Sequence, residues 1–187
     1  MKRFYEALLP IVMLPVLFLM ALAGWRVDVF EISDSRQNII FSAPAALGHK
    51  FITRYIHSVE LTPVEDEYRV IAGRLWTWEE RTRSTNAGLP FAKPRYGKFI
   101  ETGDWMIYQG GRMSWTTYYY RVGNKKLGLN QAAFEPFGRK NFFDLFPGER
   151  LIISVRRTPY IFTAIYRSAA LIGAANDVPA ISKSDRD

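Results

Sequence analysis

The stretch RYIHSVELTPVEDEYRV, residues 54–70, gathers one histidine, one serine and four carboxylates in a short span. These residue types serve three chemistries: a serine nucleophile with a histidine base, a carboxylate pair for acid–base catalysis, or a metal site. The order of the residues speaks against the first chemistry. His57 and Ser58 are adjacent in an expected strand, so their side chains point to opposite faces. The chain also contains no G-x-S-x-G elbow, so it lacks a serine hydrolase motif.

The other two chemistries have no specific support. Any acidic turn supplies paired carboxylates, and His57 with Glu65 and Glu67 matches no metal-ligand spacing. A structural role is the competing interpretation. A hydrogen bond from His57 to Glu65 would fix the register of the hairpin, with Arg54 or Arg69 balancing the remaining charge. We therefore expect no enzyme activity, no metal ion and no cofactor, and leave open whether the cluster is functional or structural.

Composition sets the broad class. The 187 residues are 48% hydrophobic and 15% aromatic, enough for a packed core, and they include no cysteine. The net charge of +7 favours acidic partners or an anionic membrane surface. The basic residues are scattered and no nucleic-acid-binding motif accompanies them, so we expect no nucleic-acid partner.

The N-terminus predicts the location. Lys2 and Arg3 precede the uncharged run ALLPIVMLPVLFLMALAGW, residues 7–25. At about 1.5 Å per residue this run spans close to the ~30 Å hydrocarbon layer. Positive charge before it predicts a single-pass inner-membrane anchor with the remainder in the periplasm, and Arg26 follows as a stop flank. The alternatives are cleavage near Ala23, where A-L-A resembles a signal-peptidase site, and a buried helix of a cytosolic domain.

Beyond the anchor the pattern changes to short alternating runs separated by turn residues. Phe51, Thr53, Tyr55 and His57 would share one strand face, and a turn is expected at Ala72-Gly73. Seven to nine strands with hairpin-length gaps predict a mainly β fold, an antiparallel sandwich or small barrel. The stretch SAPA, residues 42–45, is expected to be a loop. The other expected strands are residues 25–32, 64–82, 98–103, 105–110, 113–123, 125–130 and 150–157.

Two further segments carry expectations. In SWTTYYYRV, residues 114–122, alternation places Trp115 and Tyr119 on one face and Tyr118 and Tyr120 on the other. One face would be core, and the other is aromatic enough to contact a partner or ligand. The i, i+4 apolar spacing after residue 158 predicts a short C-terminal helix. The expected organisation is an anchor or signal segment over 1–25, an exported β-domain over 26–158, and a helix with a polar tail over 159–187.

Three blocks of sequence resemble the bacterial domain-of-unknown-function family eighteen-fifty, whose members carry H-S-V-E, T-P-V-x-E and a G-A-G-L-P-like loop. The resemblance covers about residues 25–157, and Asn86 departs from the small residue usual in the third block. The matching residues are His57, Ser58, Val59 and Glu60, then Thr62, Pro63, Val64 and Glu67, then Gly88, Leu89 and Pro90.

The resemblance implies a function in transport. Genes of this family accompany TRAP transporters of the TAXI type, which take up organic acids. It implies a membrane-anchored periplasmic accessory protein that contacts the TRAP-type permease or its substrate-binding protein, and no catalytic activity. The alternative is a periplasmic module that binds a small ligand or a metal ion. The residues expected to form a partner or ligand patch are His57, Ser58, Glu60, Glu65, Glu67, Asn86, Gly88, Leu89 and Pro90.

Overall fold

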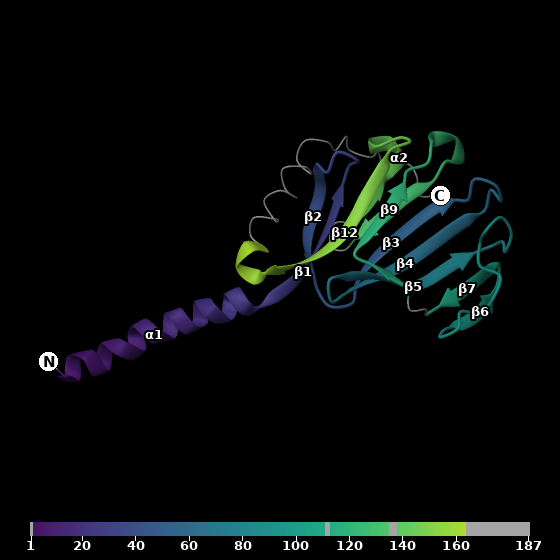
Figure 1. The fold of residues 1–187 in the computed structure, drawn as a ribbon. Coiled ribbons are helices and arrows are strands. Elements are labelled where there is room, and N and C mark those ends of the chain that lie inside the picture. The colour runs from purple at the N-terminus through teal and green to yellow at the C-terminus, as the bar shows by residue number, and fades with distance from the viewer. Residues whose placement is uncertain (1, 111–112, 135–137, 164–187) are drawn as a thin grey trace.

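The computed structural model describes residues 2–110, 113–134 and 138–163, and within them the chain forms two antiparallel sheets (Figure 1). The smaller sheet has the order β2-β1-β12-β9, and the larger has the order β11-β10-β3-β4-β5-β7-β6 with β8 paired to β5. The smaller sheet comprises β1 (Arg26–Ser33), β2 (Ile39–Ala45), β9 (Thr117–Arg121) and β12 (Arg150–Pro159). The larger comprises β3 (His49–Ile56), β4 (Pro63–Ile71), β5 (Arg74–Thr82), β6 (Lys98–Thr102), β7 (Trp105–Gln109), β8 (Ser114–Trp115), β10 (Asn130–Phe134) and β11 (Arg139–Asn141).

The helical elements are few. An N-terminal helix α1 (Lys2–Gly24) precedes β1, and a single turn α2 (Phe142–Leu145) follows β11. Two 3₁₀ segments complete the described elements, η1 (Lys125–Leu127) and η2 (Tyr160–Phe162). The described chain is therefore mainly β, as its alternating pattern predicts.

Aromatic rings fill the space between the two sheets. Phe30 of β1 is fully buried and lies 4.3 Å from the ring of Phe134 and 4.9 Å from that of Phe51, measured between centroids. Leu151 and Ile153 of β12 complete the same core from the smaller sheet. These contacts join strands far apart in sequence, so the sheets are held together by burial of apolar surface between them.

The β4–β5 hairpin illustrates how local sequence sets register. Ile71 pairs with Arg74 across a two-residue turn, and Ala72 and Gly73 have φ values of 52° and 75°. Two successive positive φ values are characteristic of a type I′ turn, whose twist matches that of the strands. The predicted turn is confirmed. A side chain at position 73 would also lie 2.9 Å from Cγ of Arg157.

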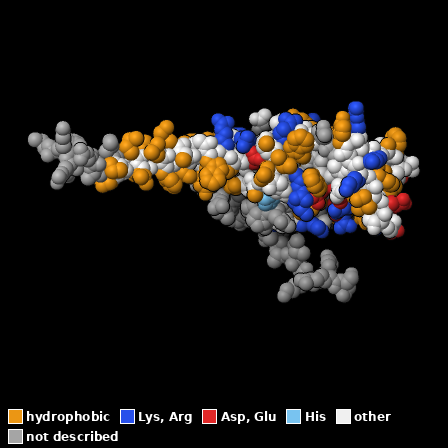
Figure 2. Space-filling view, turned by 90° about the horizontal axis from the view of Figure 1, so that it is seen from below, with side chains coloured by type: hydrophobic (Ala, Val, Ile, Leu, Met, Phe, Trp, Pro, Cys, Tyr) orange, Lys and Arg blue, Asp and Glu red, His pale blue; other side chains and the backbone are white. Residues whose placement is uncertain are grey.

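Helix α1 projects from one end of the β-domain (Figure 1), and apolar side chains cover its part nearer the domain (Figure 2). From Ile11 to Met20 every large apolar side chain is at least 44% exposed. Only Trp25 separates α1 from β1, and its ring stacks on Tyr160, whose backbone N–H donates to the Trp25 carbonyl at 2.7 Å. The end of the helix is thus attached to the ends of both central strands of the smaller sheet.

Among the described residues, no helix is both long enough and apolar enough to cross a membrane.

Four sequence expectations need correction. Residues 42–45 belong to β2, because Pro44 lies in a strand at the sheet edge, where proline is tolerated. Residues 125–127 form η1 instead of a strand. Trp115 and Tyr118 contact each other, because the irregular residue Thr116 separates β8 from β9 and breaks the alternation. The described residues also form twelve strands, more than the seven to nine expected.

The expected C-terminal helix lies mostly outside the described residues. The described part, up to residue 163, contains only η2, which follows Pro159 at the end of β12.

Candidate functional site

The β3–β4 turn uses its histidine to hold its own backbone. Strand β3 ends at Ile56, so His57 and Ser58 lie in the turn and not in a strand as expected. The His57 Nδ1 accepts hydrogen bonds from the backbone N–H groups of Glu60 at 3.2 Å and Val59 at 3.4 Å. The backbone N–H of His57 also donates to the Thr62 carbonyl at 2.9 Å. These bonds close the turn locally, and they replace the expected hydrogen bond from His57 to Glu65.

A serine links this turn to the long loop after β5. Ser84 Oγ donates to Glu60 Oε2 at 2.6 Å and accepts from the backbone N–H of Asn86 at 3.2 Å. Leu89 of the same loop is buried, whereas Gly88 is exposed and has a φ of 88°. The structure thus brings together the first and third sequence blocks that suggested a patch. Ser84, the residue that joins them, belongs to neither block and was not predicted.

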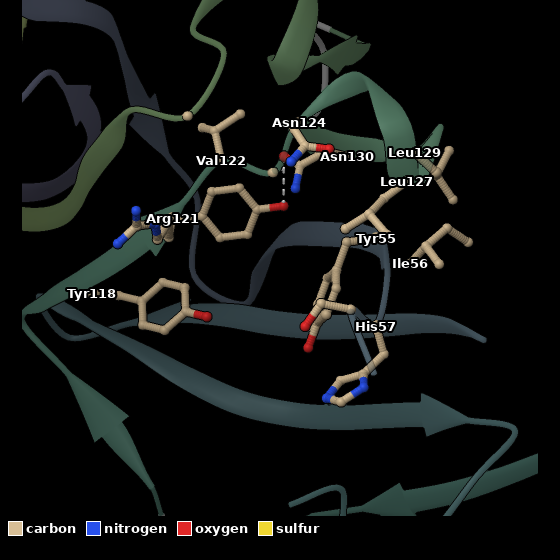
Figure 3. Close-up of a pocket in the computed structure, with 14 residues that line it drawn as sticks. Tyr55, Ile56, His57, Tyr118, Arg121, Val122, Asn124, Leu127, Leu129 and Asn130 are labelled. Carbon is tan, nitrogen blue, oxygen red and sulfur yellow. Dashed lines mark hydrogen bonds between the residues drawn. The ribbon is translucent and has the colours of Figure 1, made fainter. Parts of the chain in front are cut away.

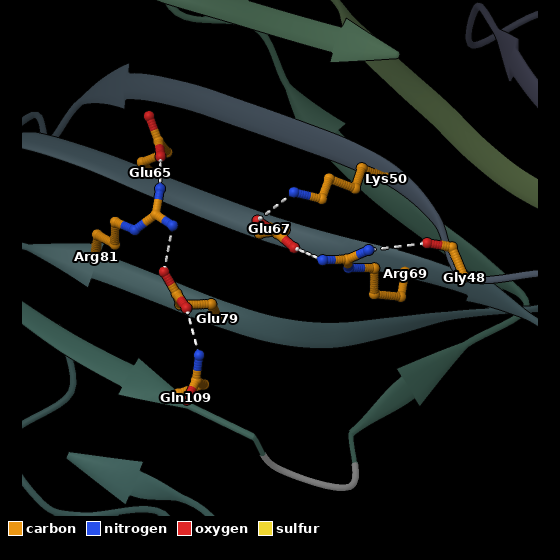
Figure 4. Close-up of polar contacts among 8 residues, drawn as sticks. All are labelled: Gly48, Lys50, Glu65, Glu67, Arg69, Glu79, Arg81 and Gln109. Carbon is orange, nitrogen blue, oxygen red and sulfur yellow. Dashed lines mark hydrogen bonds and ion pairs between the residues drawn. The ribbon is translucent and has the colours of Figure 1, made fainter. Parts of the chain in front are cut away.

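Glu65 and Glu67 lie elsewhere, on the outer face of the larger sheet (Figure 4). Arg81 pairs with both Glu65 and Glu79, and Glu79 also accepts from the side-chain amide of Gln109 at 2.8 Å. Glu67 pairs with Arg69 at 2.6 Å, as one of the two expected basic partners. Both carboxylates are therefore neutralised by cations on neighbouring positions.

The expected nine-residue patch therefore divides into two parts. His57, Ser58, Glu60 and the loop residues lie at the end of β3 and β5, while Glu65 and Glu67 lie on the outer sheet face. Within the described residues, no group of three or more His, Cys, Asp or Glu side chains is placed to hold a metal ion.

A row of polar residues on the inner face of the larger sheet is the most unusual feature of the domain. Strand register places Thr53, Asp66, Glu80 and Tyr108 side by side on β3, β4, β5 and β7. Directly opposed residues of an antiparallel pair point to the same face, so two carboxylates face each other between the sheets. Asp66 is only 8% exposed, and Thr53 Oγ1 donates to its Oδ2 at 3.4 Å.

This environment favours the protonated form of Asp66. Burial is the main cause, and the neighbouring Glu80 adds to it, so the pKa of Asp66 rises to about 7 although hydrogen bonds from Thr53 and Tyr68 act in the opposite direction. Burial also raises the pKa of Glu80. The pair is therefore able to hold a proton near neutral pH, when separate carboxyl groups in water have lost theirs.

Next to this row, a pocket of about 450 Å³ opens at the end of the domain that carries the β3–β4 turn (Figure 3). Tyr55 from β3 and Tyr118 and Tyr120 from β9 form its aromatic walls. The Tyr120 hydroxyl donates to Asn130 Oδ1 at 3.1 Å. Burial raises the pKa of all three tyrosines, so their hydroxyls stay protonated at neutral pH. Of the nine residues expected to form a patch, His57 and Ser58 line this pocket.

Sequence reasoning missed most of this site. Asp66, Glu80 and Tyr55 are not among the residues that the sequence led us to expect in a site. One signal was available: Val64, Asp66 and Tyr68 alternate along β4, which places a carboxylate on an otherwise apolar strand face.

Comparison with known families and proteins gives one match. Residues 51–134 match the family model described as Domain of unknown function (DUF1850). The match covers the larger sheet from β3 to β10 and most of the residues that line the pocket. No curated protein and no solved structure matches the chain.

Proposed function

We propose that this protein is a membrane-held accessory domain, working outside the cytoplasm beside a TRAP transporter of the TAXI type, and that it acts by binding another protein. The exposed apolar surface of α1 is the observation that carries the proposal. Water disfavours such a surface, so it needs a cover of lipid or protein. Positive charge at Lys2 and Arg3 favours an N-terminus on the cytoplasmic side, with the β-domain on the other.

The attachment of α1 supports this proposal. The Trp25–Tyr160 stack and the hydrogen bond between their backbones join the helix directly to β1 and to the end of β12. A domain attached without a flexible linker is presented in a fixed orientation, as a docking subunit requires. The alternative, release by cleavage near Ala23, would separate the domain from α1.

The opposite end of the domain is the proposed contact surface. Asp28 near the start of β1 pairs with Ala45 at the end of β2, so the β2–β3 turn lies at the α1 end and β3 runs away from it. Around the Glu60–Ser84 link, large apolar side chains are exposed, which is typical of interaction surfaces. We call this group the distal patch; it comprises Val59 (69% exposed), Leu61 (67%) and Phe91 (83%).

The position of the distal patch favours one partner. Because it faces away from α1, it suits the soluble substrate-binding protein of such a system better than the membrane-embedded part of the permease. Acidic partners would also be favoured by the net charge of +7.

The first test is purification of the full-length tagged chain from its native membrane in mild detergent, followed by mass spectrometry of the chain and of its partners. The proposal expects an intact N-terminus, resistance of the chain to alkaline carbonate extraction, and a co-purifying transporter component. A chain that begins after Ala23, or one recovered alone, would refute it.

A matched pair of variants tests the contact surface. Val59→Ser combined with Phe91→Ser should reduce co-purification, because it removes apolar contacts at the distal patch. Leu47→Ser is the control, since Leu47 is 82% exposed but lies in the β2–β3 turn at the α1 end. Equal recovery of the partner with both variants would place the contact elsewhere.

A further inference from the structure

The pocket beside the Asp66–Glu80 pair has the construction of a ligand site. Residues of β3, of β9 with the segment that follows it, and Gly148 line it, so parts of the chain far apart in sequence shape one cavity (Figure 3). Its volume of about 450 Å³ lies in the range that small organic ligands occupy. Apolar side chains supply much of the lining; they are Ile56, Val122, Leu127 and Leu129.

The polar side chains of the lining are mainly hydrogen-bond donors. Tyr55 and Tyr118 present hydroxyls, Asn124 an amide and His57 an imidazole, whereas the exposed guanidinium of Arg121 points away from these groups (Figure 3). No aspartate or glutamate is among the residues that line the pocket. A ligand that enters therefore meets N–H and O–H groups, and it meets no carboxylate that would need a cationic partner.

We propose that this pocket binds a small organic anion, a carboxylate attached to an apolar body. The hydroxyls of Tyr55 and Tyr118 would donate to the carboxylate, and the leucines and Ile56 would cover the apolar part. This inference goes beyond the proposed function, because it assigns the domain a ligand of its own and does not depend on α1 or on a protein partner.

The buried carboxylate pair couples this site to protons. Tyr118 lines the pocket and is hydrogen-bonded to Tyr68, which in turn hydrogen-bonds Asp66. Asp66 therefore lies two side chains behind the pocket wall. An ionised Asp66 would repel a bound anion through a poorly hydrated interior, and a protonated Asp66 would not.

The groups that face Asp66 come from every strand packed around it. They are Thr53 and Tyr55 of β3, Tyr68 of β4, Glu80 of β5, Tyr118 and Tyr120 of β9, with Glu65 on the other face of β4 and Tyr108 of β7 beside Glu80. None of them is cationic. Binding of an anion should therefore be accompanied by proton uptake at Asp66, and affinity should fall as pH rises from 6 to 8.

Three probes that share one apolar body test the class of ligand. Phenylbutyrate, its amide phenylbutyramide and the cation phenylbutylamine are titrated into the full-length protein in non-ionic detergent, with empty micelles as the blank. Calorimetry and ligand-observed NMR report binding. A fit of ordinary quality for a probe of this size gives a Kd of about 2 mM. We expect the carboxylate to bind about tenfold more tightly than the amide, and the amine more weakly still.

Variants place the binding in this pocket. Tyr118→Phe and Tyr55→Phe should each weaken phenylbutyrate binding by about fivefold or more, because each removes a donor to the carboxylate. Tyr119→Phe is the matched control, since Tyr119 lies on β9 between the two pocket tyrosines but is 55% exposed and absent from the lining. The same loss in Tyr119→Phe and Tyr118→Phe, or none in either, would refute this location.

The proton coupling has its own readout. Wild-type affinity for phenylbutyrate should fall by about fivefold between pH 6 and pH 8. Asp66→Asn should remove most of this dependence, and His57→Gln should retain it. Preference for the amine, absence of binding by all three probes at about 10 mM, or a dependence that vanishes only in His57→Gln would overturn the proposal.

Discussion

Replacement of Asp66 by asparagine should change how the stability of the domain depends on pH. The pKa of Asp66 is about 7 in the folded protein against 3.8 for the free side chain. Between these values the folded state retains a proton that the unfolded chain has released. The contribution of Asp66 to stability is therefore fully present below pH 3.8 and is lost as pH rises through 7. The loss amounts to about 1.4 kcal/mol per pH unit within this window.

Between pH 5 and pH 7 the wild type should accordingly lose about 2 kcal/mol of unfolding free energy through this one group. Asp66→Asn has the same size and can still accept from Thr53, but it does not ionise. Its stability should exceed that of the wild type at pH 7 by more than at pH 5, with the difference growing by about 2 kcal/mol. Urea unfolding of the full-length chain in non-ionic detergent, followed by tryptophan fluorescence at pH 5, 6 and 7, measures this difference.

Two further variants sharpen the test. Glu80→Gln removes the neighbouring charge but not the burial, so the pH midpoint should move down while the dependence remains. Asp34→Asn is the control, because Asp34 is a loop residue whose pKa is lowered by hydrogen bonding to Asn38, and it is ionised throughout this range. The same dependence of stability on pH in the wild type and in Asp66→Asn would refute the reasoning. So would an increase, with rising pH, in the stability of the wild type relative to the variant.

Three other predictions concern the stability of the domain. Arg81→Met should destabilise the domain by about 2 kcal/mol in urea unfolding at pH 7, because it leaves Glu65 and Glu79 without their shared cation. The loss of stability should be smaller at pH 4, and an unchanged urea midpoint at pH 7 would show that the two ion pairs contribute nothing. Gly97→Ala should lower the unfolding free energy by about 1–3 kcal/mol, since the new methyl group would lie 2.8 Å from the Gly110 carbonyl oxygen and still closer to that of Gln109. Gly128→Ala is the control: its methyl group meets no atom within 4 Å, so this variant measures the cost of a positive φ alone. His57→Ala should lower the unfolding free energy by about 1 kcal/mol, because it removes the acceptor for the backbone N–H groups of the turn. His57→Asn restores an acceptor and should recover part of this loss. Equal losses in both variants would show that the imidazole does not hold the turn.

The strands followed well from sequence where one face is buried against the other sheet. The buried residues Phe51, Thr53 and Val64 alternate with exposed or half-exposed residues. Such a period of two in the sequence predicts a strand with one buried face. Strand β2 was missed because its small residues and Pro44 resemble a loop. Its pairing with β1 compensates for a weak local preference.

The carboxylate pair was not predictable in the same way. From Leu75 onward, strict alternation would place Thr77, Glu79 and Arg81 on the inner face of β5. The register shift opposite Glu67 and Tyr68 leaves Trp78 as an extra residue, and so turns Glu80 inward and Glu79 outward. A bulge of this kind moves every later side chain of the strand to the opposite face of the sheet, and no residue type in the strand predicts it.

The predicted histidine role failed for a related reason. The hypothesis that His57 bonds to Glu65 assumed that both lay on one continuous hairpin face. The strand stops one residue earlier, and the imidazole then reaches the turn backbone before any carboxylate. Side-chain bonds to nearby backbone compete effectively with longer-range partners because little chain has to be ordered to form them.

The junction of α1 with β1 also has a mechanical consequence. Strand β1 pairs with β12 through eight successive residues, from Arg26 opposite Pro159 to Ser33 opposite Ile152, and with β2 on its other side. A pull between α1 and the distal patch acts along the length of β1. Its ladders on both sides would then be loaded in shear, with all rungs resisting together instead of opening one at a time. The domain is built to transmit tension along its long axis without unravelling from the end at which it is held.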